Sequence, residues 1–248
     1  MLQEGKYVYC IINSNDGRNF GPIGIGGRDD IVSSIGYNDI SAVISNTPMS
    51  NYIISSENLT DHEKVVEKAM EDYTVLPVRF CTIASSVDEI RTLLRRRYSE
   101  FKNLLLDLDN KIEMGLKVFW TDMEQIFSEI AEKDQAVTDL KKKAAVDMGD
   151  EGVKMALGKA VKRALTEKKK DESFPIFNKL RRISLKTKQK DLKGDEMVLN
   201  AAFLIDHKFE KEFDFLLEEL SQEYEPRFRF KYVGPAPTYN FVNLNIKS

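Results

Sequence analysis

The stretch Glu71–Ile83, EDYTVLPVRFCTI, joins the end of a helix to the start of a strand. Upstream of it, apolar residues recur at i, i+3, i+4 and i+7, which predicts a helix with one buried stripe. The stripe contains His62, Val65, Val66, Ala69, Met70 and Tyr73. The S/T-x-x-E form of residues 60–63 predicts that this helix begins near Asp61. From Val75 the pattern alternates as in a strand, and Pro77 suits an edge or a bulge because it cannot donate a ladder hydrogen bond.

The same criteria predict the other elements of the N-terminal half. Strands are expected at residues 6–12, 31–36, 40–44 and 112–120, with a hairpin turn at 37–39. A second helix is expected over residues 87–108, behind another S/T-x-x-E box that begins at Ser86. Helices on one face of a mixed sheet make a two-layer α+β sandwich, a variation on the ferredoxin-like theme. Residues 1–120 are therefore predicted to form an N-terminal α+β domain.

The rest of the chain divides into a helical segment and a second small domain. Residues 121–194 are predicted to be helical, with a first helix from the box at 121–124 through Met148 to Gly149, a second over 153–170, and a weaker one interrupted by Pro175. Residues 195–248 return to strand, helix and strand. Their elements are a strand at 197–205, a helix capped by Asp206, a strand at 228–232 and a strand at 242–246. The fold class is thus two small two-layer, modified ferredoxin-like α/β sandwich domains, with the middle helices joining them and packing on the second.

Several functional classes are disfavoured by the composition and motifs. No run approaches the ~20 apolar residues of a membrane span, and no basic segment followed by an apolar one marks a secretory signal. The net charge of −3 does not favour nucleic-acid binding. The glycine-rich residues 21–27 match neither phosphate-binding motif, and Cys10 and Cys81 are expected to be reduced thiols in a cytoplasmic protein.

Catalytic and metal-binding side chains do not form a recognisable constellation. His62 falls on the core stripe and His207 at a helix start, so each is interpreted as structural. Glu113 and Asp122 flank a strand without an obvious acid partner. We therefore expect no enzyme activity, no metal and no cofactor.

Taken together, stretches along the whole chain resemble one family, the gas vesicle protein GvpF/GvpL family. They are YVYCII at 7–12, the His62-Glu63 helix leading into VLPVRFCTI at 75–83, EMGLKVFW at 113–120, and GPAPTYNFV at 234–242. The last is similar to the family ending GP-x-P-x-Y-x-F-V. Residues 152–157, GVKMAL, depart from the glycine-containing Ala-Tyr-Leu segment that such proteins often carry.

The resemblance implies a non-catalytic, gas-vesicle-associated accessory protein in the cytoplasm. It implies association with the small hydrophobic major shell protein and other gas vesicle accessory proteins, participation in early shell assembly, and retention as a minor vesicle component. Neither nucleic acid nor membrane is an implied partner. A subunit built to face gas needs a partner before assembly because its exposed apolar surface would otherwise aggregate. Two alternatives stay open: a small-molecule-binding regulatory α+β protein, and an enzyme whose active-site residues are dispersed in the sequence.

A partner surface is predicted on the side of the first sheet that helices leave uncovered. If the strands at 75–80 and 112–120 share one sheet, the residues opposite the helical core gather there. They are Pro77, Arg79, Glu113, Lys117 and Phe119. A phenylalanine among mixed charges has the composition of an interface, with an apolar anchor and a polar rim. The alternative is that other parts of the chain cover this face, with Arg79 paired to a carboxylate such as Glu113.

Overall fold

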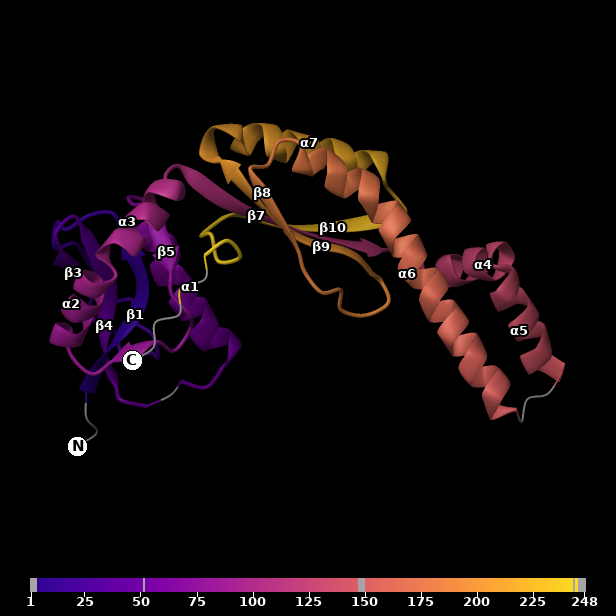
Figure 1. The fold of residues 1–248 in the computed structure, drawn as a ribbon, viewed down its shortest axis with the longest axis horizontal. Helices are drawn as coiled ribbons and strands as arrows, with labels where there is room; N and C mark the ends of the chain where they lie inside the picture. The colour runs from indigo at the N-terminus through magenta and orange to yellow at the C-terminus, as the bar shows by residue number, and fades with distance from the viewer. Residues whose placement is uncertain (1–3, 51, 147–149, 243, 245–248) are drawn as a thin grey trace. The chain divides into compact units, whose positions relative to one another are not determined.

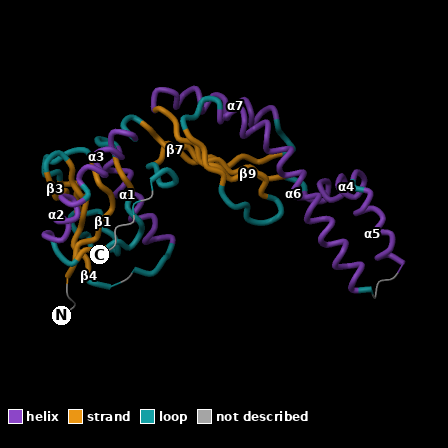
Figure 2. The backbone as a smooth tube through the Cα atoms, viewed as in Figure 1, coloured by secondary structure: helices purple, strands orange, loops and turns teal. Residues whose placement is uncertain are grey.

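The computed structural model describes residues 4–50, 52–146, 150–242 and 244 (Figure 1). Contacts divide the chain into unit 1, Met1–Glu113 with Pro235–Ser248, and unit 2, Met114–Gly234. Helices pack with a sheet in each unit, which confirms the predicted α+β class (Figure 2). The division differs from the expected boundaries at residues 120 and 194, because it falls after Glu113 and returns the last residues to unit 1.

Unit 1 is built on a six-stranded sheet. Its strands are β1 (Glu4–Ile12), β2 (Asn19–Gly21), β3 (Val32–Tyr37), β4 (Ile40–Pro48), β5 (Val75–Pro77) and β6 (Ile83–Ala84). Their order is β2-β3-β4-β1-β5, and β6 also pairs with β1. The predicted central strand is therefore central. The predicted hairpin joins β3 to β4, and Asn38 adopts a φ of 54° in its turn, a conformation that asparagine tolerates better than most residues.

Three helices belong to unit 1, and two boundaries differ from prediction. They are α1 (Ser56–Met70), α2 (Val87–Arg96) and α3 (Tyr98–Asp107). Helix α1 begins five residues early because Ser55, not the box at 60–63, accepts the cap hydrogen bond, here from the amide of Asn58. Ser86 caps α2 as predicted, but the expected single helix breaks at Arg97, whose guanidinium donates to both carboxylate oxygens of Glu100.

Strand β1 is buried on both faces in the core of unit 1. One cluster joins Tyr7, Tyr9 and Ile12 of β1 with Val65 and other residues on the predicted stripe of α1. The alternate residues of β1, including Val8 and Ile11, are also buried. Both faces of β1 are therefore covered by other parts of unit 1.

Unit 2 contains a four-stranded sheet. Its strands are β7 (Lys111–Trp120), β8 (Lys186–Gln189), β9 (Met197–Asp206) and β10 (Phe228–Ala236). The order β10-β7-β9-β8 places the fourth, first, third and second strands side by side, which is the ferredoxin-like arrangement. The strand at 112–120 was expected in the first sheet; it is instead a central strand of the second. Strand β8 was missed because its sequence, KTKQ, has no apolar alternation.

The helices of unit 2 depart most from the predicted bounds. They are α4 (Met123–Lys133), α5 (Gln135–Val146), α6 (Glu151–Arg181), the 3-10 turn η1 (His207–Phe209) and α7 (Glu210–Glu223). Asp122 rather than Thr121 caps α4. The first predicted helix breaks at Asp134, which caps α5 by accepting from the amide of Val137. Helix α6 continues through Pro175, because tertiary packing buries Ile176 and other apolar residues on its far side.

Some expectations fall outside the described residues or concern the chain ends. Met148 and Gly149, at the end of the first predicted middle helix, and Ile246, in the last predicted strand, are not described. Val242 and Leu244 of that predicted strand lie outside any strand, and residues 239–241 form a turn. Cys10 is buried, and Cys81 is partly buried with its Sγ accepting a hydrogen bond from the backbone amide of Tyr52. No helix in the described part of the chain has the length and apolar character needed to cross a membrane.

Candidate functional site

The densest group of charges in unit 2 is centred on Arg227, which lies just before β10. Its guanidinium donates to both oxygens of Glu129 at 2.9 Å, and to the oxygens of Glu172 at 2.6 and 3.0 Å. Lys168 bridges the same two carboxylates at 2.7 and 2.9 Å. The indole Nε1 of Trp120, at the end of β7, donates to Glu172 at 2.8 Å. We call these five side chains the Arg227 cluster; it ties α4 and α6 to the sheet.

The two carboxylates of this cluster are held in their ionised form. The Arg227 guanidinium and then the Lys168 ammonium lower the pKa of Glu129 to about 2. Burial opposes ionisation of Glu172, yet hydrogen bonds from Arg227, Trp120 and Lys168 leave its pKa below the ordinary value. Carboxylates held ionised in this way are poorly suited to exchange protons near neutral pH. The geometry supports a clamp between secondary-structure elements rather than an acid-base pair.

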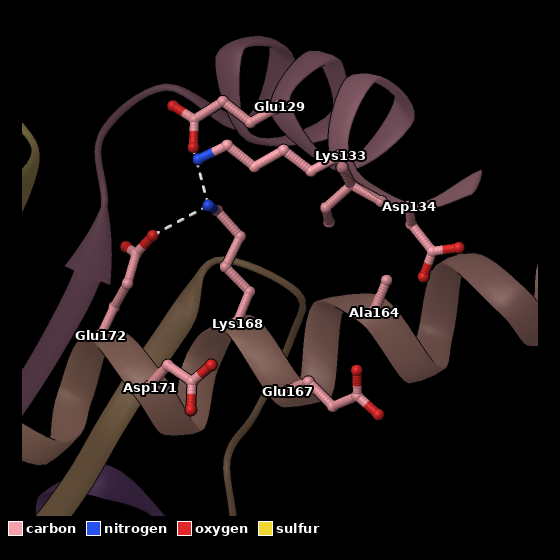
Figure 3. Close-up of a pocket in the computed structure, with 9 residues that line it drawn as sticks. Glu129, Lys133, Asp134, Ala164, Glu167, Lys168, Asp171 and Glu172 are labelled. Carbon is pink, nitrogen blue, oxygen red and sulfur yellow. Dashed lines mark ion pairs between the residues drawn. The ribbon is translucent and has the colours of Figure 1, made fainter. Parts of the chain in front are cut away.

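A cavity of about 330 Å³ opens beside this cluster, between α4 and α6 (Figure 3). Its wall consists of Glu129, Ile130, Lys133, Asp134, Ala164, Glu167, Lys168, Asp171 and Glu172. Carboxylates predominate over cations in this set, and the two apolar side chains form a small part of it. Among the described residues, no group of three or more His, Cys, Asp and Glu side chains is arranged to hold a metal ion.

The five residues predicted to share a partner surface do not lie on one sheet. Pro77 is buried in β5 of unit 1, and Arg79 is exposed just after it. Glu113 is buried in unit 1, where its carboxylate accepts hydrogen bonds from the backbone and side-chain amides of Asn240. Lys117 and Phe119 belong to β7 in the other sheet. The premise of a common face is wrong because the two strands belong to different sheets.

A buried polar group of unit 1 connects β1 with α1. The hydroxyl of Tyr7 accepts a hydrogen bond from the amide of Cys81 at 2.7 Å and lies 3.1 Å from Nδ1 of His62. Since the Tyr7 hydroxyl accepts from Cys81, it can donate its proton to His62. Burial lowers the pKa of His62 to about 4, so the imidazole is neutral at pH 7 and can accept at Nδ1. This arrangement fits the structural role predicted for His62.

Comparison with known protein families shows which family the chain belongs to. A family model described as gas vesicle synthesis protein GvpL/GvpF matches residues 5–243. The chain belongs to the GvpL/GvpF family. It is therefore a gas vesicle accessory protein, as the motifs quoted above indicated.

Relatives within the GvpL/GvpF family match most of the chain. Gas vesicle protein F of Nostoc sp. strain PCC 7120 is 26% identical over 208 residues, which cover 81% of this chain and 83% of the relative. Gas vesicle protein F1 of Halobacterium salinarum is 22% identical over 248 residues, which cover 99% and 96%. The crystal structure of GvpF from Anabaena sp. PCC7120 superposes with a TM-score of 0.81 at 24% identity, covering 98% of this chain and 100% of that one. This structural likeness shows the fold.

The GvpL/GvpF motifs that lie far apart in the sequence meet in unit 1. The Tyr7 hydroxyl is within hydrogen-bond distance of His62 Nδ1, and the centre of the Phe80 ring lies 6.0 Å from the centre of the His62 ring. Tyr239, from the C-terminal motif, packs against the same core cluster. The neighbouring Asn240 is bonded to Glu113, from the start of EMGLKVFW. The motifs of this family thus include residues that build the core of unit 1 and fasten the C-terminal segment to it.

Removing the Tyr7 hydroxyl tests this core. Tyr7→Phe is expected to lower the free energy of unfolding by about 1–2 kcal/mol, because it leaves the Cys81 amide and His62 Nδ1 without their partner. Urea unfolding followed by circular dichroism measures the change. Tyr37→Phe is the matched control, since the Tyr37 hydroxyl makes no hydrogen bond to a described residue. Equal losses from the two variants would contradict this role for the Tyr7 hydroxyl.

Sequence reasoning missed the Arg227 cluster. In sequence, the many lysines and arginines of the middle segment are typical of solvated helix faces, and Arg227 alternates with Phe228 as on the polar side of a strand. The partners of Arg227 lie 55 and 98 residues away in the sequence, on α6 and α4. No local spacing signals such a group, since its members become neighbours only when α6 docks on the sheet.

Proposed function

We propose that this chain binds the small hydrophobic major shell protein in the cytoplasm and assists nucleation and growth of the gas vesicle, and that it can remain as a minor vesicle component. The observation that carries the proposal is the match of the GvpL/GvpF family model to residues 5–243. The role requires no catalysis. An apolar shell subunit needs cover until it assembles, and a protein partner can supply it.

The revised positions of the predicted residues narrow the proposed partner surface. Pro77 and Glu113 are buried, so they support the fold rather than meet a partner. Lys117 is exposed on the side of β7 that the helices of unit 2 leave uncovered. Phe119 lies on that same side. We therefore place the contact with a gas vesicle component in unit 2, around the exposed Lys117 and beside the Phe119 ring, which is itself only 8% exposed, rather than at Arg79 of unit 1.

A pull-down with the purified major shell protein tests the proposal. The intact chain is expected to retain the shell protein, and deletion of its gene is expected to reduce vesicle formation in the producing cells. Lys117→Ala should weaken retention while Arg79→Ala should not, provided both variants unfold at the wild-type temperature. Failure of the intact chain to retain the shell protein would contradict the proposal, and the opposite ranking of the two variants would move the contact to unit 1.

The cavity beside the Arg227 cluster is the observation that favours the alternative, a small-molecule-binding regulator. Its volume of about 330 Å³ is at the lower end for ligand sites. Seven of its nine lining residues are charged, whereas ligand pockets are lined predominantly by hydrophobic and aromatic side chains. Retention of the shell protein by a Glu167→Gln/Asp171→Asn variant would separate the cavity from the proposed function.

A further inference from the structure

The helices of unit 2 cover one face of its sheet, and side-chain contacts identify that face. In β7, Trp120 donates to Glu172 of α6. In β10, the hydroxyl of Tyr232 donates to Asp214 of α7 at 2.6 Å. In β9, the Phe203 ring lies 5.4 Å from the ring of Phe213 in α7. Because side chains alternate along a strand, the neighbours of these three residues point to the opposite, helix-free face.

Two cations of β10 lie over an aromatic ring of β7 on that opposite face. The Arg229 guanidinium is 5.2 Å from the centre of the Phe119 ring, and the Lys231 ammonium is 5.5 Å from it. Such distances are typical of cation–π contacts. The two contacts hold two positive groups close together above a ring that is itself only 8% exposed. Beside them, Val233 is 66% exposed on the same side of β10.

Strand β8 adds two further lysines to this face. The register pairs Lys186 with Leu204 and Lys188 with Ala202. Residues paired across two strands point to the same side of the sheet, and Leu204 and Ala202 point away from the helices because Phe203 between them points toward α7. Both lysines are exposed. Leu204 and Ala202 are buried and provide an apolar floor.

The helix-free face therefore carries cations from three strands. We call it the basic sheet face; it consists of Lys117, Phe119, Lys186, Lys188, Arg229 and Lys231. The acidic strand residues that alternation assigns to this side are Glu113, near the start of β7, and Asp206, the last residue of β9. Lys117, Lys186, Arg229 and Lys231 form no ion pair with any described residue. The chain as a whole has a net charge of −3, so the accumulation of unpaired cations is local.

We propose that the basic sheet face docks an acidic segment of a partner protein. The four cations that form no ion pair with a described residue, Lys117, Lys186, Arg229 and Lys231, repel one another, and a carboxylate-rich segment relieves that repulsion while it pairs with them. Val233, which is 66% exposed, gives the surface an apolar contact beside its charged side chains. The basic sheet face includes Lys117, which also belongs to the surface proposed for a gas vesicle component. The inference does not require the partner to be the major shell protein, and peptide binding is measured separately from the shell-protein pull-down.

Other anionic partners fit the surface less well. Single-stranded nucleic acid gains affinity by stacking bases on exposed aromatic rings, but Phe119 is buried beneath its two cations. A membrane surface is usually met by a basic helix or segment with apolar residues that insert, whereas this surface is a sheet face with one exposed valine. A second copy of this chain would present the acidic helix α7 to the basic sheet face, and a test of self-association distinguishes it from another partner.

Fluorescence anisotropy with a labelled poly-glutamate peptide at low salt measures the docking directly. The wild-type chain is expected to bind the peptide with an affinity that falls as salt rises. Arg229→Glu/Lys231→Glu is expected to weaken binding about tenfold, a difference of about 1.4 kcal/mol. Lys141→Glu/Lys142→Glu, which makes the same change of charge at exposed positions of α5, is the matched control and should bind like the wild type. If the reversed pair does not fold, Lys117→Glu tests the same face at an exposed position.

Several results would overturn the inference. Equal weakening by the control pair would show that overall charge, not this face, governs binding. Tighter binding of oligothymidylate or of phosphatidylserine vesicles, lost in the same variant, would assign the face to phosphate groups. Self-association of the wild type at low salt, abolished by Arg229→Glu/Lys231→Glu in sedimentation velocity, would make a second copy the occupant. Absence of poly-glutamate binding would refute docking while leaving the shell-protein pull-down unaffected.

Discussion

Leu116→Ala is expected to lower the free energy of unfolding by about 3 kcal/mol, the middle of the range for truncating a buried leucine. Leu116 is 1% exposed and lies near the middle of β7, a central strand of the second sheet. Its side chain points to the same side as Trp120, toward α6 and α7. Truncation removes apolar contacts and leaves a cavity that a sheet packed on two helices cannot close completely. Urea unfolding monitored by circular dichroism gives the difference.

The adjacent residue supplies the control. Lys117 is exposed on the other side of the same strand, so Lys117→Ala is expected to change the free energy of unfolding by less than about 0.5 kcal/mol. Backbone position and strand are the same in the two variants, and only the face differs. A larger loss from Lys117→Ala than from Leu116→Ala would reverse the two faces of β7 and remove the basis of the basic sheet face.

Local chemistry was sufficient to predict many individual elements. Ser86 caps α2 as its S/T-x-x-E box indicated, and Asp206 accepts from the amide of Lys208 at the turn before α7. Strict alternation predicted β7, and a looser strand pattern predicted β9, each within one residue of its ends. These signals are short-range, because a cap needs partners within three residues and a strand pattern lies in neighbouring residues. Tertiary context did not override them.

Elements that depend on distant partners were predicted poorly. Strand β8 exists because β9 offers its edge, although KTKQ alone has little preference for a strand. Pro175 was expected to interrupt a helix, but α6 continues because Ile176 and Leu180 are buried beyond it. The assignment of β7 to the first sheet failed for the same reason, since its residues alternate correctly for either sheet. Pairing between strands is a non-local property.

The candidate surfaces likewise combine features that are local in sequence with contacts between distant strands. Alternation predicted that Lys117 and Phe119 share one side of their strand, and in unit 2 they lie on the side of β7 opposite Trp120. Their neighbours Arg229 and Lys231 could be brought to them only by the pairing of β7 with β10. The five-residue surface predicted from sequence was wrong in membership because it combined strands of two sheets.

Arg227→Ala is expected to cost about 2–4 kcal/mol, because it leaves Glu129 and Glu172 close together with Lys168 as their remaining cation. The Arg227 side chain is 30% exposed, so the lower half of that range is favoured. Arg229→Ala is the matched control two residues away: it removes the same guanidinium but no ion pair with a described residue, and its loss should stay below about 1 kcal/mol. Thermal and urea unfolding at neutral pH compare the two, and equal losses would show that the cluster contributes no specific stability.

The pH dependence of stability isolates Glu129 within the cluster. Its pKa is lowered from the ordinary 4.5 to about 2 in the folded chain, chiefly by Arg227, so the folded state binds its proton less readily than the unfolded state does. Stabilisation from this group is complete above pH 4.5 and is lost as the pH falls through 2. Glu129→Gln removes the titration, so wild type and variant should differ by about 2 kcal/mol at pH 7 and converge between pH 4.5 and 2. A difference that stays constant across this range would mean that Glu129 acts through packing rather than through its charge.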